Sequence, residues 1–210
     1  MQILVANKSH IDFAEKICEL IEQAAKERGT GIAKRTIEYI SAKIDDGKAV
    51  IALDNNCLAG FCYIESWGHE KFVANSGLVV HPNFRKSGLA KIIKKRIFEL
   101  SIEKYPDAKV FGITTSLAVM KINASLGYKP VTFSELTDDE TFWKGCQSCK
   151  NFDILARTNQ AHCLCTGMLF DPKSQSSSKR IKGEQWKKFK SFMKEKKDKV
   201  KRKLTLMTFF

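Results

Sequence analysis

The chain has 210 residues, 43% of them hydrophobic, which is enough for the core of one α/β domain. Its formal net charge of +13 is uneven: residues 173–210 hold 14 basic and 3 acidic residues, a net of +11, which leaves +2 for the body. No apolar run reaches the roughly 18 residues of a membrane span and no signal-peptide pattern opens the chain, so these features predict a cytoplasmic protein with reduced cysteines.

The first part of the chain has the pattern of one strand, two helices and three further strands. Apolar residues recur at helical spacing over residues 12–28, and a second helix is predicted over 36–44. The Asp-Asn-Asn turn at 54–56 joins two strands as a hairpin. Strands are predicted at residues 3–6, 49–53, 58–66 and 72–80, the last three pairing in antiparallel fashion.

Residues 81–90 join a strand ending at Val80 to a basic amphipathic helix. Pro82 bars continuation of the strand, and the helix is predicted to start near Ser87. The free N–H groups of its first turn favour an anion, and Gly88 lets a phosphate approach the backbone, so the turn can hold a pyrophosphate. One helix face is predicted to carry Leu89, Ile92, Ile93, Arg96, Ile97 and Leu100, and the other, solvated face Lys91, Lys94 and Lys95.

The segment Arg85-Lys86-Ser87-Gly88-Leu89-Ala90 resembles the Arg/Gln-x-x-Gly-x-Gly/Ala acyl-CoA signature of the GNAT N-acetyltransferases. A strand predicted at 109–115, a short helix at about 117–126 and the pair Gly127-Tyr128 follow in the order of that family. The resemblance implies an α/β (α+β) GNAT fold over residues 1–172, with a mixed central sheet of about six to seven strands flanked by helices. A basic C-terminal tail, residues 173–210, would follow.

The resemblance also implies direct transfer of an acyl group from acetyl-CoA, or another acyl-CoA, to an amine. In that fold the strand before the signature and the strand at 109–115 splay apart, and the pantetheine arm and the acceptor enter from opposite sides. The N–H groups of Val79 and Val80 would then face the thioester carbonyl. The pyrophosphate would be held by Arg85, Lys86, Ser87, Gly88, Leu89 and Ala90.

The catalytic acid of the family is replaced in this chain. Many GNAT enzymes carry a tyrosine four residues before the Gly of Gly-Tyr, but this chain has Asn123, which cannot donate a titrating proton. Asn123 could instead hydrogen-bond the sulfur or the pantetheine. For the base that takes the amine proton, Glu65 is the first candidate, and a water relayed by Ser76 or Asn75 is the alternative. An exposed strand-end carboxylate without a catalytic role is the competing interpretation of Glu65.

Arg35 and its neighbour Lys34 lie between the two predicted N-terminal helices, which border the acceptor cleft in GNAT proteins. A guanidinium matches a carboxylate, so the pair favours an amino-acid acceptor, and a solvated helix start explains it equally well. Residues 134–146, with Thr114-Thr115 upstream, resemble acetyltransferases of bacterial arginine biosynthesis, the N-acetylglutamate synthase type. That resemblance implies the α-amine of glutamate as acceptor and acetyl-CoA or succinyl-CoA as donor. A generic protein or small-amine N-acetyltransferase is the alternative.

Four of the seven cysteines fall in residues 146–165, as Cys146-x-x-Cys149 and Cys163-x-Cys165. A Cys-x-x-Cys turn supplies two thiolates, and two cysteines two apart on a strand would point to one face. The four predict either a structural zinc site or four reduced thiols.

The tail opens with a Ser-rich linker at 174–178, and its lysine-rich helix would present one apolar face, formed by Trp186, Phe189, Phe192, Met193 and Val200. Such a helix could meet nucleic acid, anionic lipid or an acidic surface, or pack on its own domain or on a second subunit in a homodimer. If the tail carried the function, the body would be a non-catalytic CoA-binding module.

Overall fold

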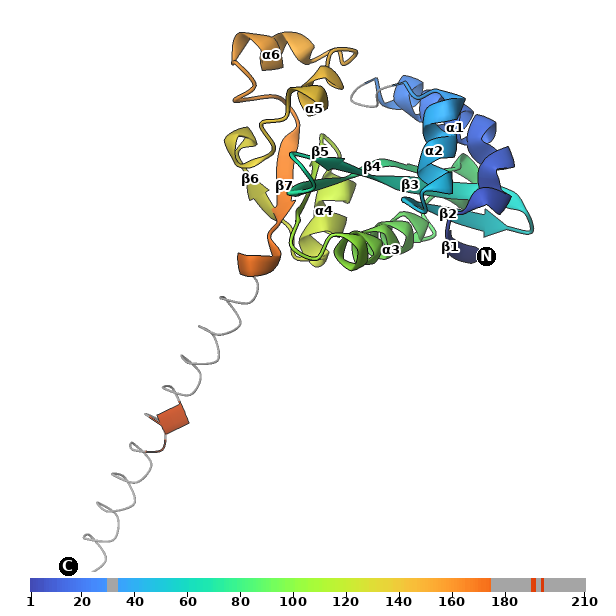
Figure 1. Cartoon of the computed structure of the whole chain (residues 1–210), viewed down its shortest axis with the longest axis horizontal. Coiled ribbons are helices and arrows are strands. Elements are labelled where there is room, and N and C mark those ends of the chain that lie inside the picture. The colour runs from blue at the N-terminus through green and yellow to red at the C-terminus, as the bar shows by residue number, and fades with distance from the viewer. Residues whose placement is uncertain (30–33, 175–189, 192–193, 195–210) are drawn as a thin grey trace, which may run out of the picture. The chain divides into compact units, whose positions relative to one another are not determined.

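The computed structural model describes residues 1–29, 34–174, 190–191 and 194 (Figure 1). The chain divides into two units, Met1–Asp171 and Pro172–Phe210. The apolar face predicted for the tail helix lies outside the described residues. Among the residues that are described, no helix combines the length and the hydropathy needed to cross a membrane.

The first unit is built on one mixed sheet of seven strands, in the order β1-β2-β3-β4-β5-β7-β6. Strands β4 and β5 are parallel neighbours, and the other pairs are antiparallel. This sheet confirms the predicted α/β class and the predicted number of strands. The strands are β1 (Gln2–Val5), β2 (Ala49–Asp54), β3 (Cys57–Trp67), β4 (Phe72–Val80), β5 (Lys109–Thr114), β6 (Lys129–Val131) and β7 (Thr166–Phe170).

Helices cover both faces of the sheet (Figure 1). Helices α1 (Ala14–Arg28) and α2 (Ile37–Asp45) lie on one face, and α3 (Leu89–Lys104) and α4 (Leu117–Ser125) lie on the other. Two short helices, α5 (Glu140–Lys144) and α6 (Phe152–Arg157), precede β7. Single 3-10 turns occupy Lys8–Phe13, Pro82–Phe84 and Phe133–Glu135.

The period-two alternation of the strands divides the core between the two faces. In β2, Ile51 and Leu53 join the core under α1 and α2, whereas Val50 and Ala52 join the core under α3. Burying one large aliphatic side chain contributes about 1.5–3 kcal/mol, so both faces stabilise the sheet that positions the site. A third core, which includes Phe111, packs beneath α5 and α6.

Strands β4 and β5 are paired over only part of their length. Their pairing ends at Ala74 opposite Phe111, although β4 continues to Val80 and β5 to Thr114. Beyond that point β4 contains a bulge, because its register against β3 shifts between Phe61 and Tyr63. Gly77 lies in the bulge with φ +65°, and a Cβ there would collide with the ring of Tyr63. We call the end of the β4–β5 pairing the fork.

The sequence placed most elements within a few residues and misjudged one helix face. The first helix begins at Ala14 rather than near residue 12, because the 3-10 turn capped by Asn7 precedes it. On α3 the predicted solvated face is wrong at Lys94, which is 2% exposed, while Ile92 of the predicted inner face is 51% exposed. Polar groups on the sheet and beside it accommodate Lys94.

Candidate functional site

A cavity of about 480 Å³ extends from the fork to the α1–α2 connection. One wall is the bulged part of β4, residues 74–78, and the facing wall is β5 with the residues that follow it, 111–116. Segments from residues 141–165 close a further side. The cavity therefore enters the sheet where β4 and β5 are unpaired, which is where backbone groups are free to meet a ligand.

The end of the cavity beneath α1 and α2 is a cluster of polar side chains. The Nε of half-buried Arg35 donates to the hydroxyl of Tyr63 at 2.6 Å, and its Nη1 donates to the carbonyl of Lys34 at 3.1 Å. Tyr39 donates to Glu65 Oε2, and Lys43 Nζ lies 2.7 Å from Glu65 Oε1. Within the described part of the chain, the Nη2 group of Arg35 makes no hydrogen bond and remains available to a ligand.

The charge states of this cluster follow from its burial. Burial and the neighbouring Tyr63 raise the pKa of Tyr39, and burial raises the pKa of Tyr63, so both hydroxyls stay protonated at neutral pH. Burial opposes the charge of Arg35, but Tyr63, Tyr39 and Glu65 outweigh it and raise the pKa of the guanidinium. Lys43 compensates the carboxylate of Glu65. The cluster consequently offers one uncompensated positive charge, that of Arg35.

The turn before α3 is shaped as an anion site. Lys86 and Gly88 have φ of 63° and 82°, left-handed conformations that direct successive N–H groups to one side. The N–H groups of Leu89 and Ala90 belong to the first helical turn and have no intrahelical acceptors, and in the part of the chain that is described the N–H of Gly88 makes no backbone hydrogen bond. Arg85 adds charge at the mouth and forms an ion pair of 2.7 Å with Glu27.

The structure brings together some of the predicted site residues and separates others. Lys34, Arg35, Glu65 and Ser76 line the cavity, whereas Val79 and Val80 lie further along β4, paired with β3. Asn123 is 1% exposed and does not line the cavity. It lies directly behind Gly112, and its Oδ1 has no partner among the described residues.

The four clustered cysteines all line the cavity. Burial, and then neighbouring cysteines, raise the pKa of Cys146 to about 11 and raise that of Cys165, which keeps both thiols protonated. The prediction that Cys163 and Cys165 lie on a strand is wrong, because β7 begins at Thr166. The predicted zinc site receives no support, since no group of three or more His, Cys, Asp or Glu in the described ranges is arranged to hold a metal.

Sequence reasoning did not identify Tyr39, Lys43 or Tyr63 as site residues. Spacing alone could have indicated them. Tyr63 and Glu65 are two apart on β3 and share a face, and Tyr39 and Lys43 are four apart on α2 and also share a face. What the sequence lacked was the packing of α2 over β3, which places the two pairs against each other.

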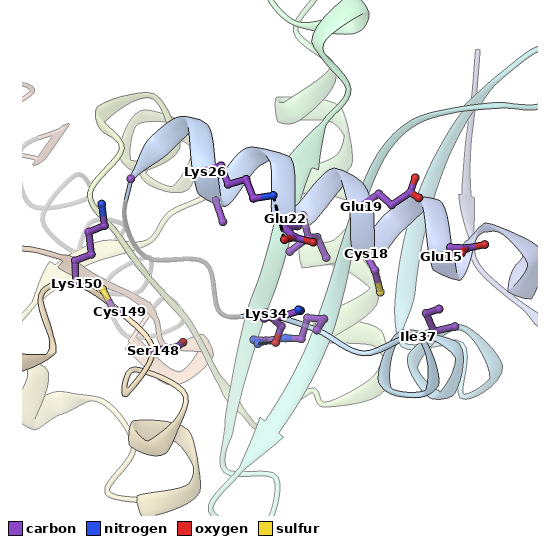
Figure 2. Close-up of a pocket in the computed structure, with 14 residues that line it drawn as sticks. Glu15, Cys18, Glu19, Glu22, Lys26, Lys34, Ile37, Ser148, Cys149 and Lys150 are labelled. Carbon is purple, nitrogen blue, oxygen red and sulfur yellow. Dashed lines mark hydrogen bonds and ion pairs between the residues drawn. The ribbon is translucent and has the colours of Figure 1, made fainter.

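A second groove, of about 700 Å³, adjoins the cavity and shares Ile21, Lys34, Arg35, Ser148 and Cys149 with it. Figure 2 shows Glu15, Cys18, Glu19 and Glu22 along α1 and Ser148, Cys149 and Lys150 at the other end of the groove. Glu22 is paired with Lys26 at 3.2 Å, whereas Glu15 and Glu19 form no ion pair with any described residue. The groove thus has an acidic end and a basic end.

A protein-family model, described as Acetyltransferase (GNAT) family, matches residues 14–116. A comparison with curated proteins found no match. Among solved structures, N-acetylglutamate synthase from Neisseria gonorrhoeae, complexed with coenzyme A and N-acetyl-glutamate, is similar at 18% identity and a TM-score of 0.58. The match covers 81% of this chain, which spans only 34% of that synthase.

Two further structures are similar over most of both chains. The Salmonella typhimurium protein yncA, with its cofactor acetyl-CoA, has 13% identity and a TM-score of 0.56, over 82% of this chain and 94% of its own. Diaminobutyrate acetyltransferase EctA from Paenibacillus lautus, in complex with L-2,4-diaminobutyric acid and coenzyme A, has 9% identity and a TM-score of 0.54. This match covers 81% of this chain and 94% of EctA. At these identities the likeness concerns the fold. The family match, the order of the strands and the forked sheet agree, and the chain has the fold of the acetyltransferase (GNAT) family.

Proposed function

We propose that the protein transfers an acetyl group, or another acyl group such as succinyl, from acyl-CoA to the α-amine of an amino acid, with glutamate in arginine biosynthesis as the first candidate. The observation that carries the proposal is the cavity, which joins the fork of the sheet to the guanidinium of Arg35, whose Nη2 makes no hydrogen bond to a described residue. One end suits a pantetheine arm, and the other offers a positive charge to a carboxylate.

The residues around the fork fit an acyl-CoA. The N–H groups of Ser87 and Gly88 in the turn, together with those of Leu89 and Ala90 at the start of α3, would hold the pyrophosphate, and Arg85 and Lys86 would add charge. When bound, the acyl-CoA supplies a thioester carbonyl open to an amine. Asn123, which is buried behind Gly112 and does not line the cavity, is not in a position to touch the pantetheine.

The reaction requires that the amine lose a proton and that the departing thiolate gain one. Of the described residues that line the cavity, Glu65 is the only carboxylate, and both of its oxygens are engaged, one by Lys43 and one by Tyr39. Glu65 therefore acts either by releasing Tyr39 when the amine arrives or by orienting a water. Ser76 on the opposite strand is the second candidate for that water.

A second class of acceptor is favoured by one observation. Glu15 and Glu19 line the groove that shares Arg35 with the cavity, and in the described structure neither has an ion-pair partner (Figure 2). A small amine with a second cationic group, such as a polyamine or a diamino acid, would place that group against them. A panel of acceptors distinguishes this class from dicarboxylic amino acids.

The test is CoA release from acetyl-CoA and succinyl-CoA with glutamate, other amino acids and polyamines as acceptors. Arg35→Ala should lower kcat/KM for the preferred amino acid at least about thirtyfold, because a guanidinium–carboxylate hydrogen bond contributes about 2–3 kcal/mol. Tyr63→Phe keeps the guanidinium and removes its 2.6 Å hydrogen bond to the Tyr63 hydroxyl, so a fall of about threefold is expected. Arg96→Ala, on the far side of the sheet, should change nothing.

The proposed acceptor class would be refuted by turnover of polyamines alone, unaffected by Arg35→Ala. Turnover of an amino acid that is equally fast in wild type and in Arg35→Ala would refute the role of Arg35 and leave the acyl transfer standing.

A further inference from the structure

Lys94 is a buried cation that no carboxylate compensates in the described structure. It lies in the middle of α3, 2% exposed, with its Nζ directed at the sheet. The Nζ donates to Asn75 Oδ1 at 3.1 Å and lies 5.3 Å from the centre of the Tyr128 ring. A buried ammonium without a counter-ion costs folding free energy, so its presence calls for a functional reason.

The partner of Lys94 is the centre of a small hydrogen-bonded cluster. Besides Lys94, Asn75 Oδ1 accepts from the hydroxyl of Tyr128 at 3.0 Å, and Asn75 Nδ2 donates to Ser101 Oγ at 2.7 Å. Ser101 in turn donates to the carbonyl of Ile97 at 2.7 Å. We call Asn75, Lys94, Ser101 and Tyr128 the Asn75 cluster. It uses every hydrogen-bonding position of the amide but one.

The Asn75 cluster stands at the fork. Asn75 is the first residue of β4 beyond the last β4–β5 pair, Ala74 with Phe111, and the bulge with Gly77 follows it directly. Lys94 and Ser101 belong to α3, which packs on β4, whereas Tyr128 follows α4, which packs on β5. The Asn75 side chain therefore ties β4 to α3 and to the residue Tyr128 that follows α4, and Asn75 lines the cavity.

We propose that Lys94 is a positioning residue: through Asn75 it holds β4 apart from β5 at the fork, where the pantetheine arm of an acyl-CoA enters. The proposal rests on the function proposed above. A methionine would fill the same volume without the cost of burying a charge, so a role in positioning explains why a lysine stands there.

The groups that face Lys94 come from each element packed against it. They are Cys62 on β3, Asn75 on β4, Tyr128 after α4 and Ser101 on α3 itself. Burial lowers the pKa of Lys94 to about 8, and burial raises the pKa of Cys62 to about 11 and that of Tyr128. Lys94 is thus the first of these groups to change its charge as the pH rises.

The experiment compares two ligands by titration calorimetry at about pH 7, where Lys94 is charged. CoA carries the pantetheine, whereas 3′-phospho-ADP keeps the pyrophosphate and lacks it. Lys94→Met should raise the Kd of CoA about tenfold and leave the Kd of 3′-phospho-ADP within about twofold. Its Tm should equal or exceed that of the wild type. Lys95→Met, on the exposed face of the same helix, should change the Kd of neither ligand.

Each result distinguishes a role of Lys94 in positioning β4 from a role in the stability of the fold alone. An unchanged Kd for CoA, or parallel losses for both ligands with a lower Tm, would overturn the proposal while the proposed function stands. A wild type that binds neither ligand would overturn both. If Lys94→Met does not fold, Tyr128→Phe removes one hydrogen bond of the Asn75 cluster and keeps the ring. This variant should raise the Kd of CoA about threefold and leave the Kd of 3′-phospho-ADP unchanged. A Kd of CoA equal to that of the wild type would contradict the proposal.

Discussion

Two cations, Arg35 and Lys94, determine the character of this site, one on each face of the sheet. Arg35 is held by the Tyr63 hydroxyl and keeps part of its guanidinium free for a ligand. Lys94 is almost fully buried and donates to a side chain of the sheet. The first is suited to binding, because its charge is exposed to the cavity, and the second to positioning, because its charge is enclosed.

The stability of the protein should depend on the protonation of Lys94. Its pKa of about 8 in the folded state lies below its ordinary value of 10.5, so between these values the unfolded chain binds more protons and stability rises with pH. From about pH 7.5 to about pH 9.5 the expected gain from this group is about 2 kcal/mol. Urea unfolding of wild type and of Lys94→Met at the two pH values measures it.

The comparison between the two proteins is needed because Cys62 acts in the opposite direction. Its raised pKa means that the unfolded thiol loses its proton first, which lowers stability above about pH 9 in both proteins. The advantage of Lys94→Met over the wild type should therefore shrink as the pH rises. An advantage that stays constant across this range would show that Lys94 is not a buried, titrating cation.

At the scale of elements, the bulge of β4 links the two faces of the site. Cys62 on β3 donates to the carbonyl of Ser76 at 3.2 Å, and Gly77 next to it lies against the ring of Tyr63. Tyr63 in turn supports Arg35. A change in the bulge would therefore reach the acceptor end of the cavity as well as the fork.

Gly77→Ala should destabilise the protein by at least about 2 kcal/mol. A left-handed φ costs an L-residue about 1–2 kcal/mol, and the new Cβ would also push the Tyr63 ring away from Arg35. Gly47→Ala is the matched control: Gly47 has a similar φ of +60°, and only the end of Lys104 lies near its Cβ position. Chemical denaturation of both variants measures the difference. Equal losses of unfolding free energy would show that the Tyr63 ring moves aside without a loss of stability.

The elements that the sequence predicted best are those whose pattern is local. The hairpin turn at Asn55–Asn56 has positive φ at both residues, as the Asp-Asn-Asn motif indicated, and β4 has the predicted bounds. The inner face of α3 was assigned by hydropathy, which treats every lysine as solvated. Lys94 is buried instead, because Asn75, 19 residues earlier, supplies an acceptor that only the folded sheet brings near.

At the scale of the molecule, the sequence predicted the GNAT fold and the turn that joins β4 to α3, and it could not predict the cavity. Arg35 and Lys34, which were predicted to border an acceptor cleft, line the cavity. The partners of Arg35 and Glu65 were missed, because contacts such as Arg35 with Tyr63 join residues that only tertiary packing brings together. The acidic end of the second groove was missed for the same reason. The sequence pattern of α1 is that of an ordinary helix with a solvated face, and the groove is formed only with the neighbouring segments.

The central claim is that one cavity brings acyl-CoA and an amine together at the fork. The most direct measurement is amine-dependent release of CoA from acetyl-CoA by the wild-type protein. We predict release that saturates in both substrates and requires an acceptor with a carboxylate beside its amine. A folded protein that binds CoA but releases none with any amino acid, polyamine or peptide would contradict the account.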